Sequence, residues 1–202
     1  MADSRLATPS KRARRQRATI VFADESGAML SPLVRRTLAP KGKTPQLIVS
    51  GQRRQKVSVI AGLTLSPHRN RFGLYFRTIP NGSFNGTTVA AFVRQLLRHI
   101  RGRVILIWDR WSAHRGFDIK AVCTDHPRLQ VELLPAYAPQ LNPVEHLWSH
   151  LKWSELCNFV PKDAADLDQT IHPVLKKNSK KQDLLLGFWK GAKLQMPLIL
   201  LR

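Results

Sequence analysis

The sequence has few of the residues that hold extracellular or membrane proteins together. Of its 202 residues only two are cysteines, Cys123 and Cys157, and they stand in no CxxC or Cys/His pattern. The sequence therefore indicates neither a disulfide framework nor a zinc site. The chain also lacks a run of about 18 apolar residues and the apolar stretch of a secretory signal. We expect a cytoplasmic protein, with no membrane partner, whose cysteines are reduced packing residues.

Acidic residues are scarce as well. The chain has 13 Asp and Glu against 33 Lys and Arg, which gives a formal net charge of +20. Such a charge is self-repelling unless a polyanion neutralises it, so nucleic acid is the expected partner. A basic membrane-surface protein would gather its cations on one face of an amphipathic helix. Here they are spread along the whole chain.

The length fits one domain with short tails. Residues 1–18 are polar and densely basic, which predicts a flexible arm. Residues 31–55, rich in Pro, Gly and cations, predict an extended loop or irregular hairpin. Residues 162–195 predict two further helices. Between these segments the hydrophobic pattern predicts strands at 18–24, 56–65, 71–79, 104–108 and 129–134 and helices at 84–100, 117–124 and 143–156.

This order, βββαβαβα, predicts an α/β protein with a mixed five-stranded sheet and helices on its faces. In such sheets, ligands gather beyond the ends of the strands. Asp24 ends the first predicted strand, and Asp109 follows the uninterrupted apolar run at 104–108. Glu145 opens a predicted helix, from which it could point back to the sheet edge. Three acids from separate elements would suit a pair of Mg or Mn ions, which prefer oxygen ligands and assist phosphoryl transfer.

Each acid also has a structural explanation that the sequence leaves open. An acid after a strand often serves as a turn residue or as a helix N-cap. Asn142, Pro143 and Glu145 fit an N-cap, a proline at the first helical position and a capping-box acid at the third. Capping and metal binding can coexist at Glu145. The combination of three such acids with a net charge of +20 favours catalysis.

Three segments around these acids are similar to a known family. FADESG at 22–27, IWDRWSAHR at 107–115 and LLPAYAPQLNPVEHLWSHLK at 133–152 resemble the catalytic blocks of mariner-superfamily DDE transposases, especially the bacterial insertion-sequence branch. The 35 residues between Asp109 and Glu145 are close to the interval in that superfamily. The third block is the most specific of the three, and the resemblance covers residues 19–160.

The resemblance implies an RNase H-like catalytic domain at 19–160. The two helices predicted by the hydrophobic pattern make residues 161–202 a C-terminal helical extension. The resemblance also implies that Asp24, Asp109 and Glu145 are catalytic ligands of two Mg ions, for which Mn can substitute. Water would first cut the transposon end, and the freed 3′ hydroxyl would then attack target DNA, typically at a TA dinucleotide. No covalent protein–DNA intermediate is implied, and a homodimer on DNA is expected.

The sequence departs from the family in two places. Arg110 stands where many relatives have Asn. Relatives carry helix-turn-helix modules before the first strand, and only about 18 residues precede it here. We therefore expect either a helix-turn-helix partner from an overlapping reading frame or an inactive DNA-binding remnant. An RNase H-like nuclease that does not transpose, such as a junction-cutting enzyme, is a further alternative.

Basic residues in the 31–55 loop and in the motifs are predicted to contact DNA. The loop has too little apolar content to pack, so its cations should bind the phosphate backbone, with a merely solvated loop as the alternative. His114 could orient a metal-bound water or a phosphate, or cap the following helix. Trp108 and Trp148 fit the core, whereas Trp111 and Tyr137 could stack on bases. The predicted DNA-contacting residues are Arg35, Arg36, Lys41, Lys43, Arg53, Arg54, Arg110, His114, Arg115 and Lys152.

Overall fold

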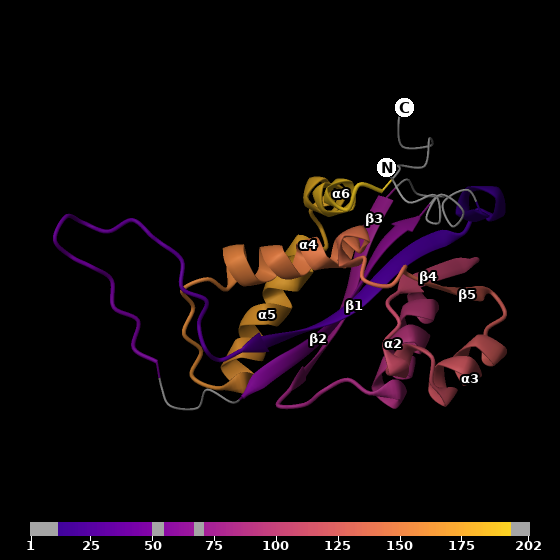
Figure 1. Ribbon diagram of the computed structural model, residues 1–202, viewed down its shortest axis with the longest axis horizontal. Coiled ribbons are helices and arrows are strands. Elements are labelled where there is room, and N and C mark those ends of the chain that lie inside the picture. The colour runs from indigo at the N-terminus through magenta and orange to yellow at the C-terminus, as the bar shows by residue number, and fades with distance from the viewer. Residues whose placement is uncertain (1–11, 50–54, 67–70, 195–202) are drawn as a thin grey trace.

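A mixed five-stranded sheet runs through the centre of the protein (Figure 1). The computed structural model describes residues 12–49, 55–66 and 71–194. The strand order is β3-β2-β1-β4-β5, in which β1 to β3 are antiparallel and β4 and β5 run parallel to β1. The strands are β1 Thr19–Met29, β2 Lys56–Ser66, β3 Arg71–Pro80, β4 Val104–Trp108 and β5 Leu129–Leu133. The predicted α/β class with a mixed sheet is confirmed.

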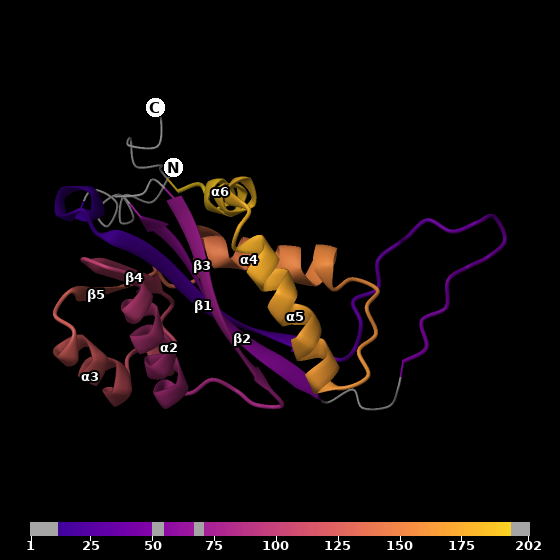
Figure 2. The same cartoon turned by 180° about the vertical axis from the view of Figure 1, so that it is seen from behind.

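Helices cover both faces of this sheet (Figures 1 and 2). One face carries α2 and α3, and the other carries α4, α5 and α6. Three short helices, η1 to η3, lie around the ends of β4 and α4. The helices are α2 Gly86–His99, η1 Ser112–His114, α3 Phe117–Asp125, η2 Pro139–Leu141, α4 Pro143–His150, the π-helical η3 Leu151–Glu155, α5 Ala164–Asn178 and α6 Gln182–Gly191.

Strand alternation divides the buried side chains into two cores. On β1, Ile20 and Phe22 belong to the core under α4 to α6, whereas Val21 and Ala23 belong to the core under α2 and α3. This follows from the pleat, which points successive side chains to opposite faces. All five residues of β4 are buried, as its uninterrupted apolar run predicts for a strand covered on both sides.

Two boundaries differ from the prediction. β1 does not end at Asp24 but continues to Met29, because residues 24–29 remain paired with β2 after β4 has stopped. Residues 12–16 are helical rather than part of a flexible arm. Ala13 is buried in the core, and Arg12 forms an ion pair with Glu132, so this segment does have packing partners. Residues 1–11 lie outside the described part of the chain.

The C-terminal helices are part of the central core rather than an appendage to it. Leu167, Ile171 and Leu185 are buried in the same cluster as the strand residues of β1 and β2. The Trp189 ring meets the Phe22 ring edge-on, with centroids 5.3 Å apart. The predicted boundary at residue 161 therefore does not separate two packing units.

Residues 31–49 form a loop without regular helix or strand that extends away from the sheet (Figure 1). Its base is tied down at Arg35, whose backbone N–H donates to Asn158 Oδ1 at 2.8 Å and whose side chain donates to the Trp153 carbonyl at 2.9 Å. Beyond this anchor, Leu38 and Ile48 are almost fully exposed. The predicted irregular loop is confirmed over residues 31–49.

Both cysteines, Cys123 and Cys157, are free thiols, as predicted. Cys123 packs at the edge of the core under α2 and α3. Among the described residues, no helix combines the length and apolar character needed to cross a membrane.

Candidate active site

The first two acids lie together because of the register between β1 and β4. The last parallel pair is Phe22 with Ile107. Continuing that register by two residues puts Asp24 opposite Asp109, just past the point where β4 ends. Because side chains alternate along a strand, both acids follow the Phe22 and Ile107 side of the sheet, which faces α4. Strand pairing thus brings together two residues that are far apart in the sequence.

The third acid is brought to this point by the start of α4. Asn142 is 3% exposed and caps the helix, with its side-chain oxygen accepting from the Val144 N–H at 3.2 Å. Its amide also donates to the Ala23 carbonyl at 3.4 Å, which joins the helix start to β1 beside Asp24. Pro143 occupies the first helical position, as predicted. Glu145 then stands in the first turn of α4.

The alternative role of Glu145 as a capping-box acid is not what the structure shows. Asn142 alone provides the side-chain cap of α4 in the described structure, and the Glu145 side chain is exposed. Val144, Trp148 and Leu151 form the buried stripe of the helix, as predicted. The Glu145 carboxylate is therefore available to bind a ligand in the cleft at the sheet edge.

Asp24 is the most strongly perturbed of the three carboxylates. Burial raises its pKa from 3.8 to about 7, and the negative charges of Glu145 and Glu25 add to the rise. The Trp148 indole N–H donates to Asp24 Oδ2 at 3.0 Å and partly counteracts it. Repulsion from Glu145 shows that these two carboxylates are close enough to interact. Perturbed carboxylates in a cleft are typical of functional sites.

All three carboxylates line one cleft of about 430 Å³. Its remaining wall comes from the segment after β4 and from the loop before α4, and is mostly apolar. No set of three Asp, Glu, His or Cys side chains in the described parts of the chain stands close enough to surround a single ion. The carboxylates thus share the cleft without forming a closed cage. The residues along its wall are Arg110, Trp111, Leu134, Pro135, Ala136, Tyr137, Ala138, Pro139 and Asn142.

Asp109 is held by contacts from the chain that follows it. Its Oδ1 accepts the Trp111 backbone N–H at 2.9 Å. The same oxygen lies 2.7 Å from His114 Nδ1, a contact whose angle is poor for a hydrogen bond and which is an ion pair when the imidazole is protonated. The carboxylate itself remains 56% exposed. The second acid is thus anchored at one oxygen while staying open to the cleft.

His114 is an internal residue. It is 2% exposed, and its Nε2 lies 3.0 Å from Glu25 Oε1. Burial lowers the pKa of the imidazole, but the hydrogen bond and charge of Glu25, together with Asp109, outweigh it and raise the pKa. A ring buried in this way does not fit the predicted DNA contact. It does not cap α3 either, since Gly116 is the N-cap residue there.

The tryptophans and the tyrosine of the three motifs divide into buried and exposed residues, as predicted. Trp108 and Trp148 are buried in the core. Trp111 is 39% exposed and Tyr137 is fully exposed, and both line the cleft. Tyr137 has a φ of 56°, a left-handed conformation that costs a non-glycine residue about 1 kcal/mol. A planar apolar surface beside the carboxylates is suited to a base.

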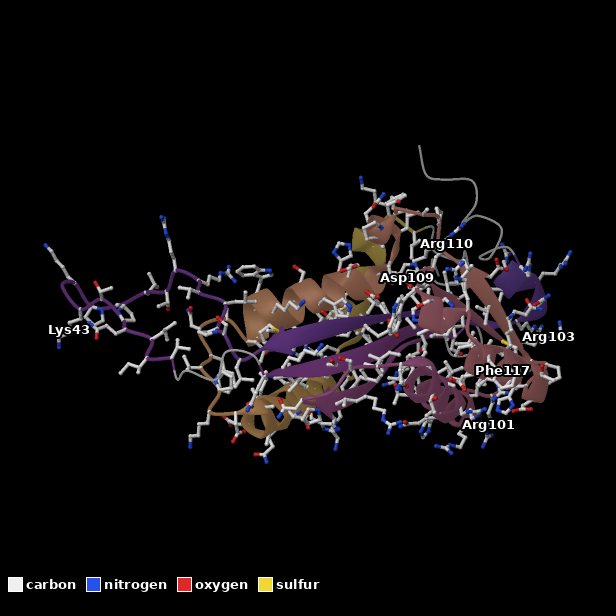
Figure 3. All side chains as sticks on the ribbon, turned by 60° about the horizontal axis from the view of Figure 1, so that its bottom comes forward. Lys43, Arg101, Arg103, Asp109, Arg110 and Phe117 are labelled. Carbon is white, nitrogen blue, oxygen red and sulfur yellow. The ribbon has the colours of Figure 1, made fainter. Side chains whose placement is uncertain are left out.

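The predicted DNA-contacting cations do not form one cluster. Lys43 lies toward the far end of the loop, well away from Asp109 and Arg110 (Figure 3). Arg110 lines the cleft, with its Nε donating to the Leu134 carbonyl at 3.3 Å. Lys152 donates to Ser26 Oγ at 2.8 Å. The exposed members are Arg35, Arg36, Lys41, Lys43, Arg110 and Arg115, and Arg53 and Arg54 lie outside the described residues.

Sequence reasoning predicted Asn142 as the N-cap of α4 but missed its contact with the Ala23 carbonyl, and it missed the roles of Glu25 and Trp148 at this site. Glu25 follows Asp24 directly and points to the opposite face of the sheet, where it meets His114. Trp148 was predicted as a core residue only, yet its indole N–H binds Asp24. Because side chains alternate between the two faces of a strand, the sequence could have placed Asp24 and Glu25 on opposite faces of the sheet. The partners across the sheet could not be predicted because they depend on the packing of α4 and η1.

The chain is similar to known proteins both in sequence and in fold. Residues 19–166 match the family described as DDE superfamily endonuclease. Curated protein sequences give no significant match. Similar solved structures include the Mos1 strand transfer complex, with a TM-score of 0.62 and 16% identity over 94% of this chain and 56% of that one. The catalytic domain of Mos1 mariner transposase gives 0.55 and 15% over 94% and 84%.

At such identities the structural likeness establishes the fold, which is that of the Mos1 catalytic domain. The chain spans little more than half the length of the Mos1 chain in the strand transfer complex. The family match covers most of the sequence and contains Asp24, Asp109 and Glu145. On this evidence the chain belongs to the DDE superfamily endonuclease family.

Proposed function

We propose that the chain is the catalytic domain of an insertion-sequence transposase, which cuts DNA strands and joins a freed 3′ hydroxyl to target DNA. The observation that carries the proposal is the convergence of Asp24, Asp109 and Glu145, from three separate elements, on one cleft. Such a centre suits a member of an endonuclease family, whose substrate is a phosphodiester. The charge of +20 supplies the complementary attraction for DNA.

The residues fit divalent cations of the Mg type. The anionic groups in the cleft are carboxylates, and the described residues that line it include neither cysteine nor histidine. The repulsion that helps to raise the pKa of Asp24 is what a cation would relieve. Asp24, Asp109 and Glu145 would hold the metal. When bound, two such ions supply activation of the attacking oxygen and stabilisation of the leaving one.

The choice of Mg, with Mn as substitute, is supported by the relatives. A Mos1 paired-end complex has been solved with Mg, and another with Mn. The first gives a TM-score of 0.61 and 18% identity over 98% of this chain and 58% of that one. For this chain the metal identity and the count of two ions are part of the proposal.

The chain's own cations would then position the DNA. Arg110 lies in the cleft itself and is suited to a phosphate next to the reacting one. Arg36, Lys41 and Lys43 are exposed on the loop and would follow the phosphate backbone at a distance from the chemistry. Arg35 is committed to anchoring the loop through its contact with the Trp153 carbonyl, so we assign it a smaller share of DNA binding.

The partners are proposed from the same relatives. Mos1 has been solved as a strand transfer complex and as a paired-end complex with a transposon end. We propose that this chain likewise acts on transposon ends and target DNA, as a homodimer, with TA as the target dinucleotide. A helix-turn-helix partner from an overlapping reading frame would supply recognition of the ends. The reaction would take place on the DNA of a bacterial cytoplasm.

The test is a cleavage and joining assay with the purified chain. Supercoiled plasmid and a labelled oligonucleotide with a free 3′ hydroxyl are incubated with Mg or Mn, and nicked and joined products are separated by electrophoresis. We expect metal-dependent nicking and transfer of the label to the plasmid. Asp109→Asn should lower both by a factor on the order of a thousand, since metal-assisted charge stabilisation is worth several kcal/mol.

The matched control is Asp125→Asn. Asp125 is an exposed acid at the end of α3 and lies 3.9 Å from the Arg94 guanidinium, too far for a hydrogen bond. This variant should act like the wild type. Nicking without joining would indicate a nuclease that does not transpose. Tight, salt-dependent DNA binding with no cleavage and no metal affinity would indicate an inactive remnant and contradict the proposal.

A further inference from the structure

The end of β4 is linked to β1 by one buried side chain. His114 lies in the short helix η1 and is 2% exposed. Its Nε2 is 3.0 Å from Glu25 Oε1, and its Nδ1 is 2.7 Å from Asp109 Oδ1. The imidazole therefore stands between two carboxylates from different strands of the sheet edge.

Aromatic packing fixes the plane of this imidazole. Trp108 stacks on it with centroids 4.1 Å apart and an interplanar angle of 6°. Trp111 meets it edge-on at 5.3 Å and 86°. With the plane set by the indoles and the in-plane direction set by two carboxylates, the ring has little freedom to turn. It is thus a rigid spacer between Glu25 and Asp109.

We propose that Glu25 and His114 are positioning residues that hold Asp109 in the orientation needed to bind a divalent cation. Asp109 follows the last residue of β4, and its side chain is 56% exposed. An exposed carboxylate at the end of a strand would otherwise sample several rotamers. Metal and catalytic sites need their groups held within about half an ångström, which requires a supporting set of contacts.

The contacts leave Asp109 available for that task. Both the Trp111 N–H and His114 engage Oδ1. Oδ2 accepts no hydrogen bond from the residues that the structure describes, so it can meet a cation or a phosphate in the cleft. His114 itself is buried, so it acts on the site through Asp109 rather than by touching DNA.

We call the chain of contacts from Glu25 through His114 to Asp109 the relay. It gives the two adjacent acids on β1, Asp24 and Glu25, different roles. Asp24 receives the Trp148 N–H from α4, on one face of the sheet. Glu25 points to the other face, where Trp108 and His114 pack. β1 therefore provides the first acid, Asp24, directly, and it orients the second acid, Asp109, through His114. A shift of β1 would move both together.

The proposal rests on the proposed function, because its readout is metal binding. Mn²⁺ affinity is measured by titration calorimetry for the wild type, Glu25→Gln, His114→Gln and the double variant. We expect each single variant to lower the affinity by about 10- to 100-fold, as loss of a supporting contact to a metal ligand does. The double variant should be no weaker than His114→Gln alone, because the two residues act in series.

This double-mutant cycle distinguishes the relay from a direct electrostatic effect of Glu25 on the bound metal. If Glu25 acted on the metal only through space, its effect would persist when His114 is absent, and additive losses would overturn the relay. The matched control is Glu155→Gln, which breaks another glutamate–histidine contact, 3.2 Å from His150 Nε2, away from the cleft. It should leave Mn²⁺ affinity unchanged. Failure of the wild type to bind Mn²⁺ would instead contradict the proposed function.

A second readout does not depend on metal or on the stability of a histidine variant. The ¹⁵N resonances of the His114 ring are recorded in the metal-free wild type, Asp109→Asn and Glu155→Gln. We expect Asp109→Asn to shift the Nδ1 resonance and Glu155→Gln to leave it in place. An unchanged His114 spectrum in Asp109→Asn would overturn the link between the two residues.

Discussion

The acidic cleft and the basic loop at residues 31–49 differ in what holds them in place. Asp24 and Asp109 lie at the edge of paired, buried strands, and Glu145 lies in the first turn of α4, which is joined to β1 through Asn142. The loop has no regular structure and is tied down only near Arg35 among its described residues. Rigid elements thus carry the proposed chemistry, whereas an extended segment carries charge for the DNA backbone.

This difference sets what a substitution should do in each region. In the cleft, a change of a few atoms alters charge or orientation at a fixed point, so its effect should be large and specific. On the loop, each cation adds a similar increment of attraction, so effects should be small and should depend on salt.

The largest effect should come from Glu145→Gln. A glutamine serves a capping box as well as a glutamate does, so a capping role would leave activity and stability nearly unchanged. As a metal ligand, Glu145 cannot be replaced by an amide, and cleavage should fall by a factor on the order of a thousand. Cleavage rate and urea unfolding are measured on the same preparation. Wild-type activity in this variant would remove Glu145 from the centre.

Asp24→Asn should change stability in a pH-dependent way in the metal-free protein. The pKa of Asp24 is about 7 in the folded state, above the ordinary value of 3.8. Between pH 3.8 and about pH 7 the folded state therefore keeps a proton on Asp24 that the unfolded chain has lost. Wild-type stability should therefore fall as the pH rises from about 4 to about 7. At pH 8 the variant should be more stable, by at most about 4 kcal/mol for a three-unit shift.

Urea unfolding in EDTA at pH 4 and pH 8 measures this difference. At pH 4 the variant and the wild type should be nearly equal, because Asp24 is then protonated in the folded state. Asp125→Asn, an exposed acid, should show no gain at pH 8. A gain for Asp24→Asn that is the same at both pH values would contradict the buried-charge explanation.

The smallest effect should come from the loop. Replacing Arg36, Lys41 and Lys43 with alanine should weaken DNA binding and reduce the slope of log K against log salt by up to about three. Fluorescence anisotropy at several salt concentrations measures both quantities. The matched control replaces Lys176, Lys177 and Lys180, which are exposed at the end of α5 and beyond it. Equal slopes in the two triple variants would mean that the loop has no special part in DNA binding.

Much of this architecture could be predicted from the sequence. The uninterrupted apolar run at 104–108 identified a strand covered on both faces, and Asn142 with Pro143 identified the start of α4. The predicted end of β1 was wrong. Ser26 and Gly27 are typical turn residues, but pairing with β2 keeps them in the strand. Local propensity is overruled there by the neighbouring strand.

The candidate site was predictable only in part. Asp24, Asp109 and Glu145 could be named from their positions and from the family resemblance. The contact of Glu25 with His114 and that of Trp148 with Asp24 join residues about 90 and 120 positions apart. Such contacts depend on how helices pack on the sheet and leave no local signal. His114 was therefore predicted at the DNA surface, although it lies inside the protein.

The central claim is that the three carboxylates hold metal against the phosphate that is cut. The direct measurement replaces a non-bridging oxygen of that phosphate with sulfur and compares cleavage in Mg and in Mn. Because sulfur is a poor ligand for Mg and a better one for Mn, we expect a loss on the order of tenfold or more in Mg that Mn restores. Asp109→Asn should show no restoration. Equal wild-type sensitivity to sulfur in both metals would contradict the claim.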